Sequence, residues 1–293
     1  MQGTPLQPLR EYGQSPWVHG LVSGSELEQL VRTHGIRGAR LSQGLPIAEI
    51  QDACEVLGPV WEESAGEDGY VSAPADPDQV DRPNFMAEIA DLSAIEDAVA
   101  AGIPVNATQI CSLSRYDEVV EAYMRGIERF VASGEDPASV TSIASFEVSA
   151  VDAEVDRLLA ALDRQAARLS GRLGVANARL AYQAYKRAFG ERRWHSLAAR
   201  GARPQRCSWA STSRSNPAYC DVTYVEELIG PETVTTLTPS TIQAFEDHGV
   251  AADKLERGID EARALFEEIR DLGVDLRQVW RAVCEPRGVP CDQ

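Results

Sequence analysis

The chain has 293 residues, a length that suits one large α/β barrel or two ordinary domains. Its formal net charge of −17 excludes a general affinity for nucleic acid or an anionic membrane surface, because both require a basic face. No apolar run approaches the roughly 20 residues of a membrane span, and we expect no secretory signal at the N-terminus. Six scattered cysteines form no CxxC pair, so we expect free thiols in a cytoplasmic protein.

Short apolar, β-branched runs alternate with longer helical patterns, which is typical of βα units around a parallel sheet. Eight such runs predict a (β/α)8 TIM barrel of the α/β class as a single domain over residues 1–293, with its core at about 14–280. The predicted strands are Trp17–Leu21, Arg37–Leu41, Gly69–Ala73, Asn84–Ile89, Val105–Ile110, Ser142–Val148, Ser208–Thr212 and Thr233–Leu237.

Helices are clearest after residue 90, where apolar residues recur with a helical period. Ser93, followed by Glu96 three residues later, predicts a capped helix start. The Pro-rich stretch Ser72–Arg82 predicts a loop where a barrel ordinarily has a helix. The predicted helices are Ser93–Ala101, Tyr116–Ser133, Val151–Leu169, Val175–Phe189 and Ala251–Leu272.

Side chains two residues apart on a barrel strand share a face, and catalytic groups stand on inward positions near the carboxyl ends of the strands. An ionised Glu inside an apolar strand is costly unless it is paired or functional, which singles out Glu88 and Glu147. Residues predicted to share faces are Trp17 with His19, Met86 with Glu88, Asn106 with Thr108, Ser145 with Glu147, and Ser211 with Ser213.

Several segments spread over most of residues 14–280 carry recognisable motifs in a co-linear order. They are Gln14-Ser15-Pro16-Trp17, Arg82-Pro83-Asn84-Phe85-Met86, Val105-Asn106-Ala107-Thr108, Trp209-Ala210-Ser211-Thr212 and Tyr224-Val225-Glu226-Glu227-Leu228-Ile229-Gly230-Pro231. Together these segments resemble bacterial transaldolases. The resemblance implies a transaldolase-type barrel of the class I aldolase kind, in which a fourth-strand lysine forms a Schiff base with a ketose. It also implies that Asn106, Thr108, Ser145 and Ser211 occupy pocket positions.

The departures from the family pattern bear directly on chemistry. The family's lysine position holds Glu88, and a carboxylate cannot condense with a ketone. The two lysines of the chain, Lys186 and Lys254, lie outside the predicted strands, on helix faces expected to be solvated. At the position of the arginine that holds phosphate in the family, this chain has Ala150. The first-strand aspartate of the family corresponds to His19 here, and an aromatic residue of its sixth strand corresponds to Glu147.

The remaining predictions concern substrate contacts and coverage of the pocket. Trp17, Ser213 and Arg214 are predicted to contact substrate, with Arg214 one position from a basic residue of the family. Relative to the family, a helix is missing between Ser42 and Ile50, as are the helix after the third strand and a final helix. The pocket is therefore expected to be more open, or covered by a second copy or a partner protein.

The sequence allows two interpretations of each ionisable candidate residue. Glu88 is a general acid or base, or a carboxylate paired with an arginine after loss of function. Glu147 is a second cavity carboxylate, or forms a structural salt bridge. His19 is a proton shuttle or a structural histidine, and the three together are an alternative metal site. We otherwise expect no cofactor, since nothing local signals one.

Three functions remain open from the sequence. The first is a repurposed acid–base enzyme catalysing cyclisation, dehydration, isomerisation or a retro-aldol step on a non-phosphorylated small molecule, with Glu88, Glu147 and His19 as catalytic residues. The second is a non-catalytic binding or scaffold protein. The third is residual transaldolase activity through an unrecognised amine.

Overall fold

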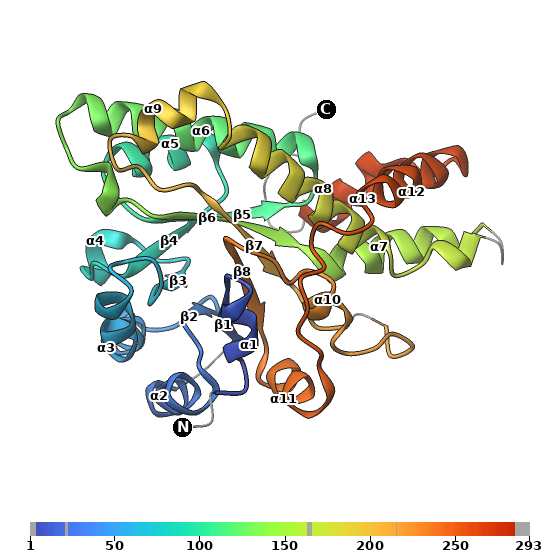
Figure 1. Cartoon of the computed structure of the whole chain (residues 1–293), viewed down its shortest axis with the longest axis horizontal. Coiled ribbons are helices and arrows are strands. Elements are labelled where there is room, and N and C mark those ends of the chain that lie inside the picture. Colours follow the sequence, from blue (N-terminus) through green and yellow to red (C-terminus); the bar gives the residue numbers. More distant parts are fainter. Residues whose placement is uncertain (1–3, 21–22, 163–165, 215, 285–293) are drawn as a thin grey trace.

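A computed structural model describes residues 4–20, 23–162, 166–214 and 216–284. Eight parallel strands close into a barrel in sequence order, with β8 paired to β1 (Figure 1). The predicted (β/α)8 fold is therefore confirmed. The strands are β1 (Gln14–Gly20), β2 (Gly38–Leu41), β3 (Val71–Ala73), β4 (Phe85–Ile89), β5 (Val105–Ile110), β6 (Ser142–Glu147), β7 (Arg206–Ala210) and β8 (Thr233–Leu237).

Helices surround the barrel and bury their apolar stripes against its outer face. In Figure 1, α5, α6 and α9 lie together at the top, and α7, α8, α12 and α13 gather at one side. Among the described residues, no helix combines the length and apolar character needed to cross a bilayer. The helices are α1 (Gln7–Glu11), α2 (Gly24–Gln29), a π-helical turn (Leu30–His34), α3 (Ile47–Glu63), α4 (Pro77–Val80), α5 (Leu92–Ala100), α6 (Leu113–Ala132), α7 (Val148–Ala160), α8 (Leu173–Ala188), α9 (Arg192–Ala198), α10 (Thr223–Glu226), α11 (Pro239–His248), α12 (Ile259–Asp271) and α13 (Leu276–Cys284), with 3-10 turns at Pro137–Ser139 and Ala166–Leu169.

Several predicted boundaries need correction. Helix α5 starts one residue before Ser93, because the Asp91 side chain caps it by accepting from the Ala94 amide at 2.9 Å. The helix predicted over 251–272 begins only at residue 259, since the Lys254 and Leu255 amides both donate to the Ile229 carbonyl.

Two further predictions hold in part. The helix predicted over 151–169 starts at residue 148 and ends at 160, and a 3-10 turn follows at 166–169; residues 163–165 of that prediction lie outside the described part. Residue 21 of the first predicted strand is also outside it. The Pro-rich loop after β3 contains one short helix, α4, which Asp76 caps.

The interior of the barrel is plugged at its middle by large apolar side chains. Trp17, Tyr70, Met86, Ile143 and Val234 form one buried cluster inside the strands. Trp17 is fully buried, and it fits because Gly38 stands opposite; a Cβ there would lie 2.4 Å from the indole ring. The cluster fills the middle of the barrel, as side chains do in barrels of eight strands.

Candidate active site at the carboxyl ends of the strands

A polar cavity of about 550 Å³ opens above the plug. Its position at the carboxyl ends of the strands is where barrel enzymes place their reactive groups. The predicted residues His19, Glu88 and Thr108 line this cavity. The full lining is His19, Arg40, Leu41, Ser42, Gln43, Pro74, Glu88, Thr108 and Gln109.

Glu88 projects from β4 and is held by an arginine from β2. Arg40 Nε and Nη2 lie 2.9 and 3.3 Å from the two carboxylate oxygens of Glu88, a two-point contact that fixes both groups. Ser72 on β3 donates a third hydrogen bond to Glu88 at 3.1 Å. Both side chains of the ion pair are only 11% exposed, so bulk water screens the pair weakly.

Glu147 ends β6 and shares the same cation. Its Oε1 lies 3.8 Å from Arg40 Nη1, and its Oε2 accepts from the Ser211 hydroxyl at 2.5 Å. Burial alone would lower the pKa of Arg40, but the charges of Glu88 and Glu147 raise it overall. Two carboxylates therefore contact one guanidinium. Glu88 lines the cavity, whereas Glu147 is buried and does not line it.

His19 stands beside this cluster on β1, next to Arg40 across the β1–β2 register. Its Nδ1 lies 3.2 Å from the Arg40 carbonyl oxygen, which can only accept a hydrogen bond. Nδ1 therefore carries the proton, and in the neutral ring Nε2 has the free lone pair. Burial, and then the charge of Arg40, lower the pKa of His19 and favour this neutral form.

A chain of neutral hydrogen bonds supports the cluster from below. Ser145 donates to Asn106 Oδ1 at 2.8 Å, and Asn106 Nδ2 donates to Ser72 at 2.9 Å. Asn106 and Ser145 are completely buried, so they position Ser72 and Glu88 and do not line the cavity. They were predicted to contact substrate, and this placement makes them supporting residues.

Backbone strain also gathers at the cavity. Gln109, in its lining, has φ of +61°, at a break in the β5–β6 register. Ser211, which was expected at a pocket position, does not line the cavity; it donates to Glu147 and has φ of +55°. Non-glycine residues occupy this region at an energetic cost and do so most often at functional sites.

Three predicted substrate contacts do not fit the structure. Trp17 belongs to the buried plug, where Gly38 leaves room for its ring. Ser213 bonds to hydroxyls at the start of α11, Thr238 and Thr241, at 3.1 and 2.9 Å. Arg214 is exposed and folds back on the carbonyls of its own loop, 3.4 Å away.

Arg40 is the site residue that the sequence prediction missed. The signal was present, because Arg40 is a charged residue inside a predicted strand, as Glu88 is. Its guanidinium also touches both carboxylates, which argues against a metal held by His19, Glu88 and Glu147. Within the described part of the chain, those three do not bring ligand atoms together around one point.

Comparison with known proteins identifies the family. The model of the family described as Transaldolase/Fructose-6-phosphate aldolase matches residues 87–285. A transaldolase from Parafrankia sp. (strain EAN1pec) is 41% identical over 292 residues, which cover 91% of this chain and 79% of that protein. The chain belongs to the transaldolase family. A transaldolase from Mycobacterium tuberculosis (strain ATCC 25618 / H37Rv) is 43% identical over 265 residues, covering 82% and 71% of the two chains. Transaldolase 2 from Nostoc sp. (strain PCC 7120 / SAG 25.82 / UTEX 2576) is 35% identical over 343 residues, covering 94% and 90%.

Neither lysine of this transaldolase-family chain lines the cavity. Lys186 on α8 forms an ion pair with Glu256 at 2.6 Å, with nearly half of its side chain exposed. Lys254 bonds to Glu226 and Glu227, both at 3.1 Å. Each amine is paired with carboxylates outside the cavity lining. The cavity thus contains a carboxylate on β4 and no lysine amine.

Proposed function

We propose that this chain is a transaldolase-family barrel that carries out acid–base chemistry on a non-phosphorylated carbonyl compound, without an imine intermediate. The observation that carries the proposal is the cavity itself, where Glu88 is bridged to Arg40 and no lysine is present. Imine formation requires an unprotonated amine close to the carbonyl carbon. A neutral imidazole beside a guanidinium instead supports proton transfer.

His19 is the proposed base. Its protonated Nδ1 is anchored on the Arg40 carbonyl, so Nε2 can take a proton from the carbon next to a substrate carbonyl group. The electron pair of the broken C–H bond then moves to the carbonyl oxygen as an enolate forms. Return of a proton to the same carbon gives exchange with solvent. Where that carbon carries a hydroxyl, the hydroxyl proton moves to the enolate oxygen, a new carbonyl forms at that carbon, and the carbon-bound proton returns to the former carbonyl carbon, which gives an isomer.

Arg40 is the proposed partner for the developing negative charge. Glu88 occupies Nε and Nη2, whereas Nη1 makes only the longer contact with Glu147. Nη1 can therefore donate to a substrate oxygen without breaking the bidentate pair. A donor fixed in advance stabilises charge where it develops, which is how an oxyanion hole acts.

The charge of the cavity favours an unphosphorylated substrate. Glu88 and Glu147 outnumber Arg40, and the neutral form of His19 adds no positive charge. A phosphate needs arginine or lysine donors that are not already neutralised. Ala150, on α7, stands where the resemblance expects such an arginine.

Solvent deuterium exchange tests the proposal. The protein is incubated in D2O with dihydroxyacetone, glyceraldehyde or erythrulose, and the α-proton signals are followed by NMR. We expect exchange that falls by roughly 10²–10⁴-fold in His19→Gln. The matched control is His195→Gln, because His195 is exposed on α9, far along the chain from the cavity strands. Exchange retained in His19→Gln would refute the assignment of His19 as the base.

A second function, binding without catalysis, is favoured by one specific observation. Glu88 is paired with Arg40 and also bonded by Ser72, as expected of a carboxylate held for structure. In that case the same hydroxycarbonyl compounds, or other polar ligands, would bind with no exchange above the rate without protein. Calorimetry on the exchange samples separates this outcome from proton transfer.

A further inference from the structure

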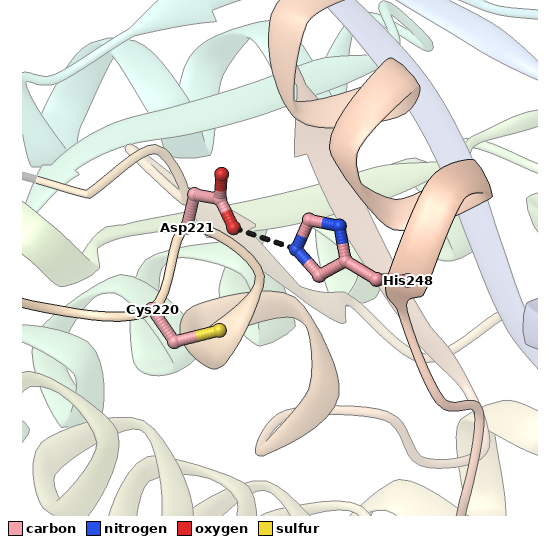
Figure 2. Close-up of side chains that lie close together, drawn as sticks. All are labelled: Cys220, Asp221 and His248. Atoms are coloured by element: carbon pink, nitrogen blue, oxygen red, sulfur yellow. Dashed lines mark hydrogen bonds and ion pairs between the residues drawn. The ribbon is translucent and has the colours of Figure 1, made fainter.

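We propose a zinc site on the outer surface, formed by Cys220, Asp221 and His248. Cys220 and Asp221 lie in the loop between β7 and α10, and His248 is the last residue of α11. Figure 2 shows Cys220 and Asp221 reaching from this loop toward the His248 ring. The site is independent of the cavity chemistry proposed above.

The ligand atoms are already close together. Asp221 Oδ1 lies 2.8 Å from His248 Nε2, and all three ligand atoms, including Cys220 Sγ, lie within 4.8 Å of one another. Ligands around a tetrahedral zinc ion are about 3–4 Å apart. Side-chain rotation of the exposed Cys220 can make up the difference, since no core packing holds it.

The donor set matches the chemistry of zinc. Thiolate, imidazole and carboxylate are the three ligand types that Zn²⁺ takes in proteins. Zn²⁺ is usually four-coordinate, so three side-chain ligands leave one position for water. Asp247 Oδ2 lies 3.2 Å from His248 Nδ1 and orients the ring so that Nε2 faces Asp221. A carboxylate on the second ring nitrogen is the usual support for a zinc-bound histidine.

Binding releases protons, and the balance is simple. The Cys220 thiol loses its proton to become a thiolate ligand. His248 gives up any proton on Nε2, the ring nitrogen that bonds to Asp221 and would bind the ion. Zinc takes the place of this proton, so affinity rises with pH.

The ion would join the loop after β7 to the end of α11. The loop after β7 also contains Ser211, which bonds to Glu147, and Ser213, which bonds to Thr238 and Thr241. Zinc at its far end would fix this loop to the carboxyl end of α11. Its role would be a clamp, because none of its ligands lines the cavity.

Cobalt titration tests the site directly. Chelator-treated protein is titrated with Co²⁺ alone, because a thiolate ligand produces a near-ultraviolet charge-transfer band. We expect one equivalent to bind with this band, and Zn²⁺ to abolish it by displacement. The band should be lost in Cys220→Ser, and affinity should fall at least roughly tenfold in His248→Gln. His195→Gln, which alters an exposed histidine elsewhere, should bind as the parent does.

A parent protein without the band would overturn the proposal. So would a band and affinity that persist in both Cys220→Ser and His248→Gln, since they would come from other thiols. As a second readout, Zn²⁺ should raise the unfolding temperature of the parent and leave that of Cys220→Ser unchanged.

Discussion

Replacing Arg40 by methionine removes the guanidinium that contacts both Glu88 and Glu147. Methionine keeps the length of the side chain and its apolar stem, so the change is mainly one of charge. Glu88 and Glu147, with side chains 11% and 3% exposed, would then be left without the guanidinium that now compensates them. The variant therefore tests whether the site is held together electrostatically.

The magnitude follows from the geometry. Unit charges 2.9 Å apart, at an effective dielectric constant of about 20, attract each other by about 6 kcal/mol, which is an upper limit. Removing one partner of a buried pair costs about 3–5 kcal/mol of unfolding free energy. At about 2 °C per kcal/mol for a chain of this size, the unfolding temperature should fall by roughly 6–10 °C.

Urea unfolding followed by circular dichroism measures this loss. The matched control is Arg157→Met, which breaks the 2.6 Å contact of Arg157 with Glu154, where the arginine is 66% exposed. A surface pair of this kind contributes little to stability, because solvent screens it. If Arg40→Met lost no more stability than Arg157→Met, the reasoning about a buried, shared cation would be refuted.

Three further predictions concern pH and packing. Because the pKa of His19 is lowered, kcat/KM for proton exchange should fall on the acid side with a midpoint below pH 6.5, and a midpoint above it would contradict His19 as the base. Burial raises the pKa of Asp152 to about 7, so the folded state keeps a proton that the unfolded chain loses near pH 4, and stability falls as pH rises toward 7. Asp152→Asn should remove this pH dependence, so that between pH 5 and pH 8 its unfolding free energy rises by about 3 kcal/mol relative to that of the parent, as measured by urea unfolding. The same pH dependence in both proteins would contradict the raised pKa of Asp152. Gly38→Ala should cost about 1–3 kcal/mol by displacing Trp17, detectable as a lower unfolding temperature and a changed tryptophan emission, and an unaltered protein would contradict the plug.

Much of the barrel could be predicted from local pattern, because each strand is a short apolar run and side chains alternate between its faces. The same alternation predicted inward positions for His19 and Glu88, and both line the cavity together with Thr108. It could equally have found Arg40, which stands on the cavity face of β2. What it could not supply was the pairing, since the contact of Arg40 with Glu88 depends on how neighbouring strands are staggered.

The wrong predictions came from contacts distant in sequence. Trp17 shares its face with His19, but Gly38 on the neighbouring strand lets it sink into the barrel, away from substrate. Arg214 was placed by its position in the chain, whereas the fold of its loop turns it onto nearby carbonyls. Asn106 lies under the cavity because Ser72 and Glu88 cover it.

Borohydride trapping tests the central claim most directly. The protein is incubated with dihydroxyacetone or fructose 6-phosphate, reduced, and weighed intact by mass spectrometry, beside the Mycobacterium tuberculosis transaldolase treated in the same way. The cavity chemistry predicts an unchanged mass for this chain. A reduced adduct of stoichiometric yield, mapped to Lys186 or Lys254, would contradict it, because an imine would then form in spite of Glu88.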